Sequence, residues 1–192
     1  KLDPNYASLY PILARAYEAE EMLDEAMNVL KEGMAVDEYN ELLYVLAGKL
    51  SFKRQRPEEA VDYLREAIDL NPGNVEAVHT LASFLKFQER YDELEELIER
   101  LKEYGEVDPL LTWYEASVLK EKEMYDEAYA LFREVEQQFS TDIDFLEEYA
   151  FFLLEYGLRE QALEKLRALL KLKPDRDDIE QLLFDLEEEA GI

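Results

Sequence analysis

The chain contains no cysteine, one histidine, one tryptophan, and only six glycines and six prolines in 192 residues. Without cysteine it can form neither a disulfide nor a thiolate metal site, and a single histidine cannot complete a transition-metal site. No run of about 18 apolar residues predicts a membrane-spanning helix, and nothing resembles a signal peptide. The lack of cysteine fits a reducing compartment, and we therefore expect a cytoplasmic location.

Basic residues are scarce, since 21 Lys and Arg face 47 Asp and Glu and leave a net charge of −26. This excess opposes a phosphate backbone or an anionic membrane surface, so nucleic acid and membranes are poor candidates as partners. Hydrophobic residues still make up 48% of the chain, which is enough for a folded core. No glycine-rich phosphate loop, nucleophile elbow or Cys/His pair is present, and we expect no enzyme activity, no cofactor and no metal.

A pattern of two helices recurs along the chain at intervals of 34 residues, and residues 41–74 show it most completely. Small residues recur at one position of each first helix (Ala14, Gly48, Ala82, Ala116 and Ala150) and, with one exception, at one position of each second helix (Ala26, Ala60, Leu94, Ala128 and Ala162). Residues that can cap a first helix recur as Asn40, Asn74, Asp108 and Asp142. Proline recurs after a second helix as Pro4, Pro72 and Pro174. The register predicts close helix crossings within each pair.

This period, with small residues at the crossing and proline near the end of the unit, resembles the tetratricopeptide repeat family. The resemblance implies an all-α fold: a right-handed α-solenoid of five antiparallel helix pairs with a C-terminal capping helix, eleven helices in all and no strand. We assign the repeats to residues 7–40, 41–74, 75–108, 109–142 and 143–176. Residues 1–6 are interpreted as the tail of a preceding repeat and 177–192 as the capping helix. We expect the chain to be a fragment of a longer bacterial protein.

Three positions depart from the family pattern. Leu94 stands where a small residue is expected, so it should either separate the third helix pair or be absorbed by Ala82, because overpacking costs about 1–3 kcal/mol. Pro11 requires the first helix to begin just before it, where a missing N–H costs little. The aromatic residue of the fourth repeat is displaced by one position, because Thr112 and Trp113 are exchanged relative to the family pattern. Trp113 and Tyr114 could therefore stack on a ligand or belong to the core, and the sequence leaves both open.

In this family the first helices line a concave groove that binds segments of partner proteins. The inward positions carried over from the family give the candidate peptide-binding residues Arg15, Lys49, Phe52, Lys53, His79, Ser83, Lys86, Phe87, Trp113, Tyr114, Ser117 and Lys120. Among the 24 inward positions of the first four repeats, five are basic and three acidic, although the chain as a whole is strongly acidic. Either the groove is electropositive or these basic residues pair with neighbouring carboxylates. The fifth repeat is instead acidic, with Glu147 and Glu148 expected to repel an acidic ligand.

The inward positions contain no asparagine, so the two-carboxylate clamp by which some family members hold a chaperone tail is not expected. His79 could act as a base or a ligand, but packing in the groove is the simpler interpretation. We therefore expect a non-enzymatic scaffold or adaptor that binds a protein or peptide partner, acidic with apolar anchors. Two alternatives stay open: self-association through exposed solenoid ends, giving a homodimer, or a regulatory module of a larger protein.

Overall fold

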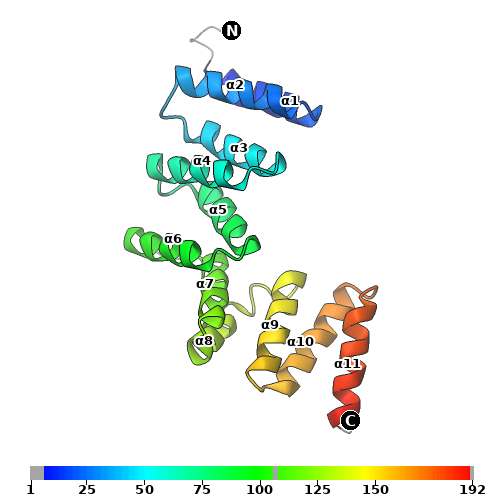
Figure 1. Ribbon diagram of the computed structural model, residues 1–192. Coiled ribbons are helices and arrows are strands. Elements are labelled where there is room, and N and C mark those ends of the chain that lie inside the picture. The colour runs from blue at the N-terminus through cyan, green and yellow to red at the C-terminus, as the bar shows by residue number, and fades with distance from the viewer. Residues whose placement is uncertain (1–6, 106–107, 191–192) are drawn as a thin grey trace. The chain divides into compact units, whose positions relative to one another are not determined.

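The computed structural model describes residues 7–105 and 108–190, and these contain eleven α-helices and no strand (Figure 1). The helices are α1 (Leu9–Ala19), α2 (Leu23–Val36), α3 (Glu41–Lys53), α4 (Pro57–Leu70), α5 (Val75–Phe87), α6 (Tyr91–Tyr104), α7 (Pro109–Glu121), α8 (Tyr125–Val135), α9 (Ile143–Glu155), α10 (Arg159–Leu172) and α11 (Asp177–Ala190). The first ten pack as five consecutive pairs, and α11 packs on α10. The predicted all-α fold of paired helices is confirmed.

The chain divides into two compact units, Lys1–Glu106 and Val107–Ile192. The first unit contains the helix pairs α1–α2, α3–α4 and α5–α6, which correspond to three predicted repeats. The second contains α7–α8, α9–α10 and α11. Each unit has its own buried core and is described by itself.

All four predicted capping residues directly precede a helix, and three of them make a side-chain capping bond. Asn74, Asp108 and Asp142 each accept a hydrogen bond from a main-chain N–H of the first turn, at 2.9–3.1 Å. Asn40 lies at the predicted capping position before α3, but its side chain makes no capping bond and instead donates to the carboxylate of Asp37 at 3.3 Å. The turn before α3 is thus closed by two side chains, and the backbone amides at its N-terminus are left to other partners.

The prolines lie where a helix tolerates them. Pro11 is the third residue of α1, within the first turn, where its missing N–H removes no intrahelical bond. Pro72 and Pro174 follow the last residues of α4 and α10 by two positions, as predicted. Pro4 lies outside the described residues.

The turn between the two helices of a pair has the same backbone geometry in all five repeats. One residue in each turn has a left-handed φ of 57–86°: Glu21, Gln55, Glu89, Glu123 and Gly157, spaced by 34 residues. The N–H of the residue after each bonds to the carbonyl five positions back, at 2.8–2.9 Å, which is the Schellman arrangement that ends a helix. The repeat period therefore imposes this turn even where the residue is not glycine.

The crossing of α3 and α4 in the first unit requires the small residues that the sequence predicts there. A Cβ at Gly48 would lie 2.6 Å from Cγ of Leu64 and 3.2 Å from the carbonyl oxygen of Ala60. The third pair differs, because Leu94 is completely buried at its crossing and α5 and α6 make far fewer close approaches than the other four pairs. The structure thus agrees with the first of the two predicted outcomes, separation of the helices by Leu94.

The second unit has an aromatic core. Phe132, Phe145, Tyr149 and Phe152 are all completely buried, and the ring of Phe132 stacks on that of Tyr149 with centroids 5.1 Å apart. The Tyr149 hydroxyl has no hydrogen-bond partner among the described residues, and burial raises its pKa. The ammonium of Lys165 lies 5.9 Å from the centre of the Tyr149 ring. This core is therefore held by ring packing around one buried hydroxyl that is not satisfied.

The last helix, α11, covers the end of the α9–α10 pair. Ile179 is only 2% exposed and packs against a buried cluster from α9 and α10, with the half-buried Leu182, Leu183 and Leu186 beside it. These four residues are the apolar stripe that predicted an amphipathic capping helix. Burial of this stripe attaches α11 to the unit.

Candidate functional site

Eight of the twelve predicted peptide-binding residues lie on the first helices of the first unit. Helix α3 packs against both α1 and α5, so the three helices lie side by side. Arg15 is on α1; Lys49, Phe52 and Lys53 are on α3; and His79, Ser83, Lys86 and Phe87 are on α5. Contacts between side chains of neighbouring helices, described next, place four of the eight on the surface that these helices share, which we call the α1–α3–α5 face: Lys49, Phe52, Lys53 and Phe87.

Three phenylalanines form a cluster on this face: Phe52, Phe84 and Phe87, here called the Phe cluster. The rings of Phe52 and Phe84 stack with centroids 4.1 Å apart, and Phe87 meets Phe52 edge-on at 6.0 Å. Phe87 is 77% exposed, whereas Phe52 and Phe84 are half-buried. A ring that packs on another ring yet is open to solvent has the character of a binding anchor, because it can bury large apolar area at little cost in side-chain entropy.

Two of the predicted cations on this face are already paired across helices. Lys49 of α3 bonds to Glu76 of α5 at 2.6 Å, and Lys53 of α3 forms an ion pair with Glu18 of α1. The alternative in which basic residues pair with neighbouring carboxylates thus describes both lysines. Such exposed pairs contribute only about 0–1 kcal/mol each. They leave the face less electropositive than a count of its residues suggests.

The predicted residues of the second unit lie mostly in its interior. Trp113, Tyr114 and Ser117 are 5%, 8% and 1% exposed, and the Ser117 hydroxyl donates to a carbonyl of its own helix. The indole N–H of Trp113 donates to Glu148 at 2.7 Å, and its ring packs among three other aromatic rings. For Trp113 and Tyr114 the core alternative therefore describes the structure. Lys120 is half-buried and pairs with the adjacent Glu121 at 3.2 Å.

The carboxylates of the fifth repeat are also engaged. Both terminal nitrogens of the Arg176 guanidinium bond to Glu147, at 2.7 and 2.9 Å, and this bidentate contact lowers the pKa of the Glu147 carboxyl. Glu148 accepts the bond from Trp113. Two carboxylates that were expected to repel an acidic ligand thus have structural roles.

Two features of the site were not predicted. Phe84, which stacks on Phe52, was not among the inward positions, although its spacing of three from Phe87 on one helix is a signal that could have found it. Glu18 and Glu76 are two of the three acidic inward positions mentioned above, but their individual partners were not foreseen. Long side chains on adjacent helices choose partners by local geometry, which the repeat period does not encode.

Metal and membrane sites were also sought in the described part of the chain. Among residues 7–105 and 108–190, no group of three or more His, Asp or Glu side chains could hold a metal ion. Within the same residues, no helix has both the length and the apolar character needed to span a bilayer.

Comparison with known sequences agrees with the repeat pattern over most of the chain. Residues 109–176 match the family of YpiA-like, C-terminal tetratricopeptide repeats, and residues 51–111 match the tetratricopeptide repeat family. The chain is a tetratricopeptide repeat protein. It is 42% identical over 189 residues to the TPR repeat-containing protein YpiA of Bacillus subtilis (strain 168). The match covers 98% of this chain but only 45% of that protein, so the chain spans less than half of its relative's length.

Solved structures agree on the fold. The chain is similar to YrrB, described as a TPR protein with an unusual peptide-binding site, with a TM-score of 0.70, 21% identity and coverage of 90% of this chain and 89% of that one. It is also similar to PilF of Pseudomonas aeruginosa, with a TM-score of 0.77, 14% identity and coverage of 98% and 86%. At these identities the similarity establishes the tetratricopeptide fold alone.

Proposed function

We propose that this protein is a non-enzymatic scaffold or adaptor that binds a segment of a partner protein on its α1–α3–α5 face. The observation that carries the proposal is the Phe cluster, in which Phe87 is 77% exposed and Phe52 supports it. Leaving such a ring in water is unfavourable, and covering it would contribute about 1.5–3 kcal/mol. The YrrB structure, described as holding a peptide-binding site, supports the choice of a peptide as ligand. The cytoplasm is proposed as the compartment because the chain lacks cysteine.

The ligand is proposed to be an extended segment with an aromatic or aliphatic anchor, and an acidic flank is a secondary preference. Lys49 and Lys53 are paired with Glu76 and Glu18, so a ligand carboxylate would have to replace a carboxylate that is already present. The exchange yields little net free energy at an exposed site. Lys86, next to Phe87 in sequence, is the better-placed cation for an acidic flank, although it also has an interaction within the protein. Apolar contact should therefore dominate affinity.

Selection of random short peptides on the immobilised protein, followed by titration of recovered peptides by fluorescence anisotropy, tests the proposal. Phe87→Ser should weaken binding by about 30-fold, the effect of removing a central anchor worth about 2 kcal/mol. The matched control is Phe184→Ser on α11, another phenylalanine that is 61% exposed, and it should leave binding unchanged. Lys49→Glu combined with Lys86→Glu should weaken binding of acidic peptides only. Equal loss in both serine variants, or none in either, contradicts this assignment.

Self-association is a second candidate, and one observation favours it. Ile12 of α1 is 64% exposed and Leu9 of the same helix is 38% exposed, which gives an apolar strip at the start of the first unit. Light scattering across a concentration series would reveal a homodimer. Ile12→Lys should then return the measured mass to that of a monomer, whereas Phe87→Ser should not.

A further inference from the structure

A cavity of about 130 Å³ opens between α4, α5 and α6 in the first unit. Its floor is apolar and consists of Ile68, Leu81, Leu85 and Leu97, each no more than 7% exposed. None of its lining residues belongs to the Phe cluster. The cavity lies beside the pair that Leu94 separates, where α5 and α6 approach each other least.

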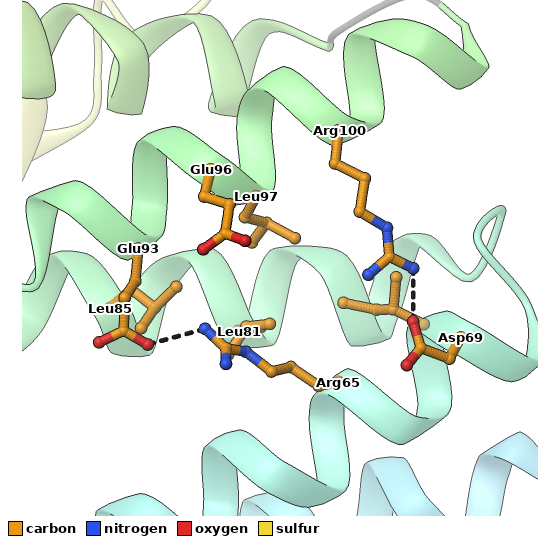
Figure 2. A pocket seen from close by; sticks show the side chains of 9 residues that line it. Arg65, Asp69, Leu81, Leu85, Glu93, Glu96, Leu97 and Arg100 are labelled. Carbon is orange, nitrogen blue, oxygen red and sulfur yellow. Dashed lines mark hydrogen bonds and ion pairs between the residues drawn. The ribbon is translucent and has the colours of Figure 1, made fainter.

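The rim of the cavity is charged and bridges two helices. Figure 2 shows Arg65 and Asp69 of α4 facing Glu93 and Arg100 of α6 in two ion pairs, whose charged atoms lie 2.7 and 2.5 Å apart. Glu96 lines the cavity on α6 between these pairs and belongs to neither. Glu93 also accepts two hydrogen bonds from Arg90, at 2.7 and 2.9 Å, so the charged rim residues and Arg90 together carry no net charge. Glu96 is the rim carboxylate that stands outside these pairs.

The two helices that carry the rim are acidic as a whole. Helix α4 carries five acidic side chains and one basic, and α6 carries six acidic and two basic. A potential of this sign attracts a segment rich in lysine or arginine and disfavours an acidic one. A cavity of about 150 Å³ with apolar walls is large enough for benzene, so this slightly smaller one has room for a single aliphatic side chain.

We propose that the cavity between α4 and α6 is a second docking site, which takes one apolar side chain presented between basic residues by a segment of a partner protein. The apolar floor receives the anchor side chain. Glu96 and the acidic faces of α4 and α6 hold its basic neighbours. The site is separate from the α1–α3–α5 face, and the opposite charge requirement of its ligand allows one protein to engage two different segments.

Methyl-detected NMR with three short synthetic peptides tests this site, using the methyl groups of Ile68 and Leu97 as reporters. The central triplets are Lys-Leu-Lys, Lys-Ala-Lys and Glu-Leu-Glu, capped at both ends and otherwise identical. The first should shift both reporters saturably. The second should bind at least tenfold more weakly because it lacks the anchor, and the third about tenfold more weakly because two ion pairs become repulsions. No saturable shift with Lys-Leu-Lys, or equal responses to the leucine peptides of either charge, overturns the proposal.

Substitutions separate the cavity from its surroundings. Leu97→Tyr should fill the space and reduce Lys-Leu-Lys binding at least tenfold, and the second repeat already accommodates tyrosine at the equivalent position, Tyr63. Glu96→Lys keeps the cavity and should weaken binding about threefold to tenfold, whereas Glu134→Lys, an exposed change on α8, should have no effect. Phe87→Ser should also have none, which distinguishes this site from the Phe cluster. Undiminished binding in both Leu97→Tyr and Glu96→Lys contradicts the proposal.

Discussion

In the first unit, three phenylalanines of α3 and α5 form a cluster at the surface, whereas in the second unit three phenylalanines of α8 and α9 belong to the core. Phe87 is 77% exposed, while Phe132, Phe145 and Phe152 are completely buried. Both units repeat the same 34-residue backbone plan with the same left-handed turn. The comparison teaches that the period determines how helices pair, and that the placement of aromatic residues determines which face is available to bind.

The two units also differ in the side chains that fill their interiors. The α3–α4 crossing depends on Gly48 and Ala60, where no Cβ fits at the glycine, and the first unit is otherwise filled mainly by aliphatic side chains. The second unit fills its interior with rings, among them Trp113. The four predictions below are chosen to break or sharpen this contrast, from the largest expected effect to the smallest.

The largest effect is expected at one repeat position that carries Phe132 in the second unit and Leu64 in the first. Phe132→Ala should lower the free energy of unfolding by about 3–5 kcal/mol and Leu64→Ala by about 2–5 kcal/mol, since each leaves a cavity in a core. The only tryptophan, Trp113, belongs to the second unit, so its fluorescence during urea unfolding reports on that unit, while circular dichroism reports on both. Phe132→Ala should move the fluorescence midpoint more than Leu64→Ala does. Equal shifts would mean that the two cores are not separate.

The second-largest effect is expected at the helix crossings within the pairs. Ala60→Leu and Ala128→Leu should each cost about 1–3 kcal/mol, because both residues are completely buried and the added atoms would force a helix pair apart. Leu94→Ala is the matched opposite change and should cost about 2 kcal/mol, at the low end for a buried leucine, because α6 has room to move toward α5. Chemical denaturation followed by circular dichroism measures all three. Unchanged midpoints in both leucine variants would show that the crossings are misassigned.

The repeat register predicted the pairing of helices because it depends on side-chain size, and size is written directly in the sequence. Gly48 and Ala60 could be assigned to a crossing without coordinates, and three caps followed from residues that can accept a bond. The missing capping bond of Asn40 could not be predicted, since its amide has a competing partner in Asp37 and only geometry decides between the two. The left-handed turns at Glu21 and Glu89 were likewise hidden, because glycine marks such a turn only at Gly157.

The candidate site was predicted less completely than the fold. Phe52 and Phe87 were named from their helix positions and do lie together. Trp113 occupies an equally inward position yet is buried, because its neighbouring rings leave room for it in the core of the second unit. Whether an inward residue is exposed depends on the volume of residues from other helices, and that quantity is not periodic.

A smaller effect is expected from two buried hydroxyls, one in each unit. Ser51 of α3 and Tyr149 of α9 are completely buried, and their hydroxyl oxygens have no hydrogen-bond partner among the described residues. Ser51→Ala and Tyr149→Phe should therefore each raise stability by about 1 kcal/mol, since the desolvation cost of an unsatisfied group is removed. The control is Tyr44→Phe, which deletes a hydroxyl that donates to the carbonyl of Glu38 and should not stabilise. A loss of stability in Tyr149→Phe would reveal a buried water on that hydroxyl.

The smallest effect concerns the left-handed turn that both units share. The second unit has one turn of each kind, with Glu123 at φ 59° and Gly157 at φ 86°. A non-glycine residue in this region costs about 1–2 kcal/mol, but glycine also loses about 0.5–1 kcal/mol in conformational entropy on folding. The net expectation is a gain of about 0.5 kcal/mol for Glu123→Gly and a loss of about 1 kcal/mol for Gly157→Ala, both read from the urea midpoint of Trp113 fluorescence. Glu89→Gly, measured by circular dichroism, should repeat the gain in the first unit, because its backbone has the same φ of 57°. If glycine stabilises at position 123 but destabilises at position 89, the turns are not equivalent, and the shared backbone plan that underlies the comparison of the two units fails at its simplest point.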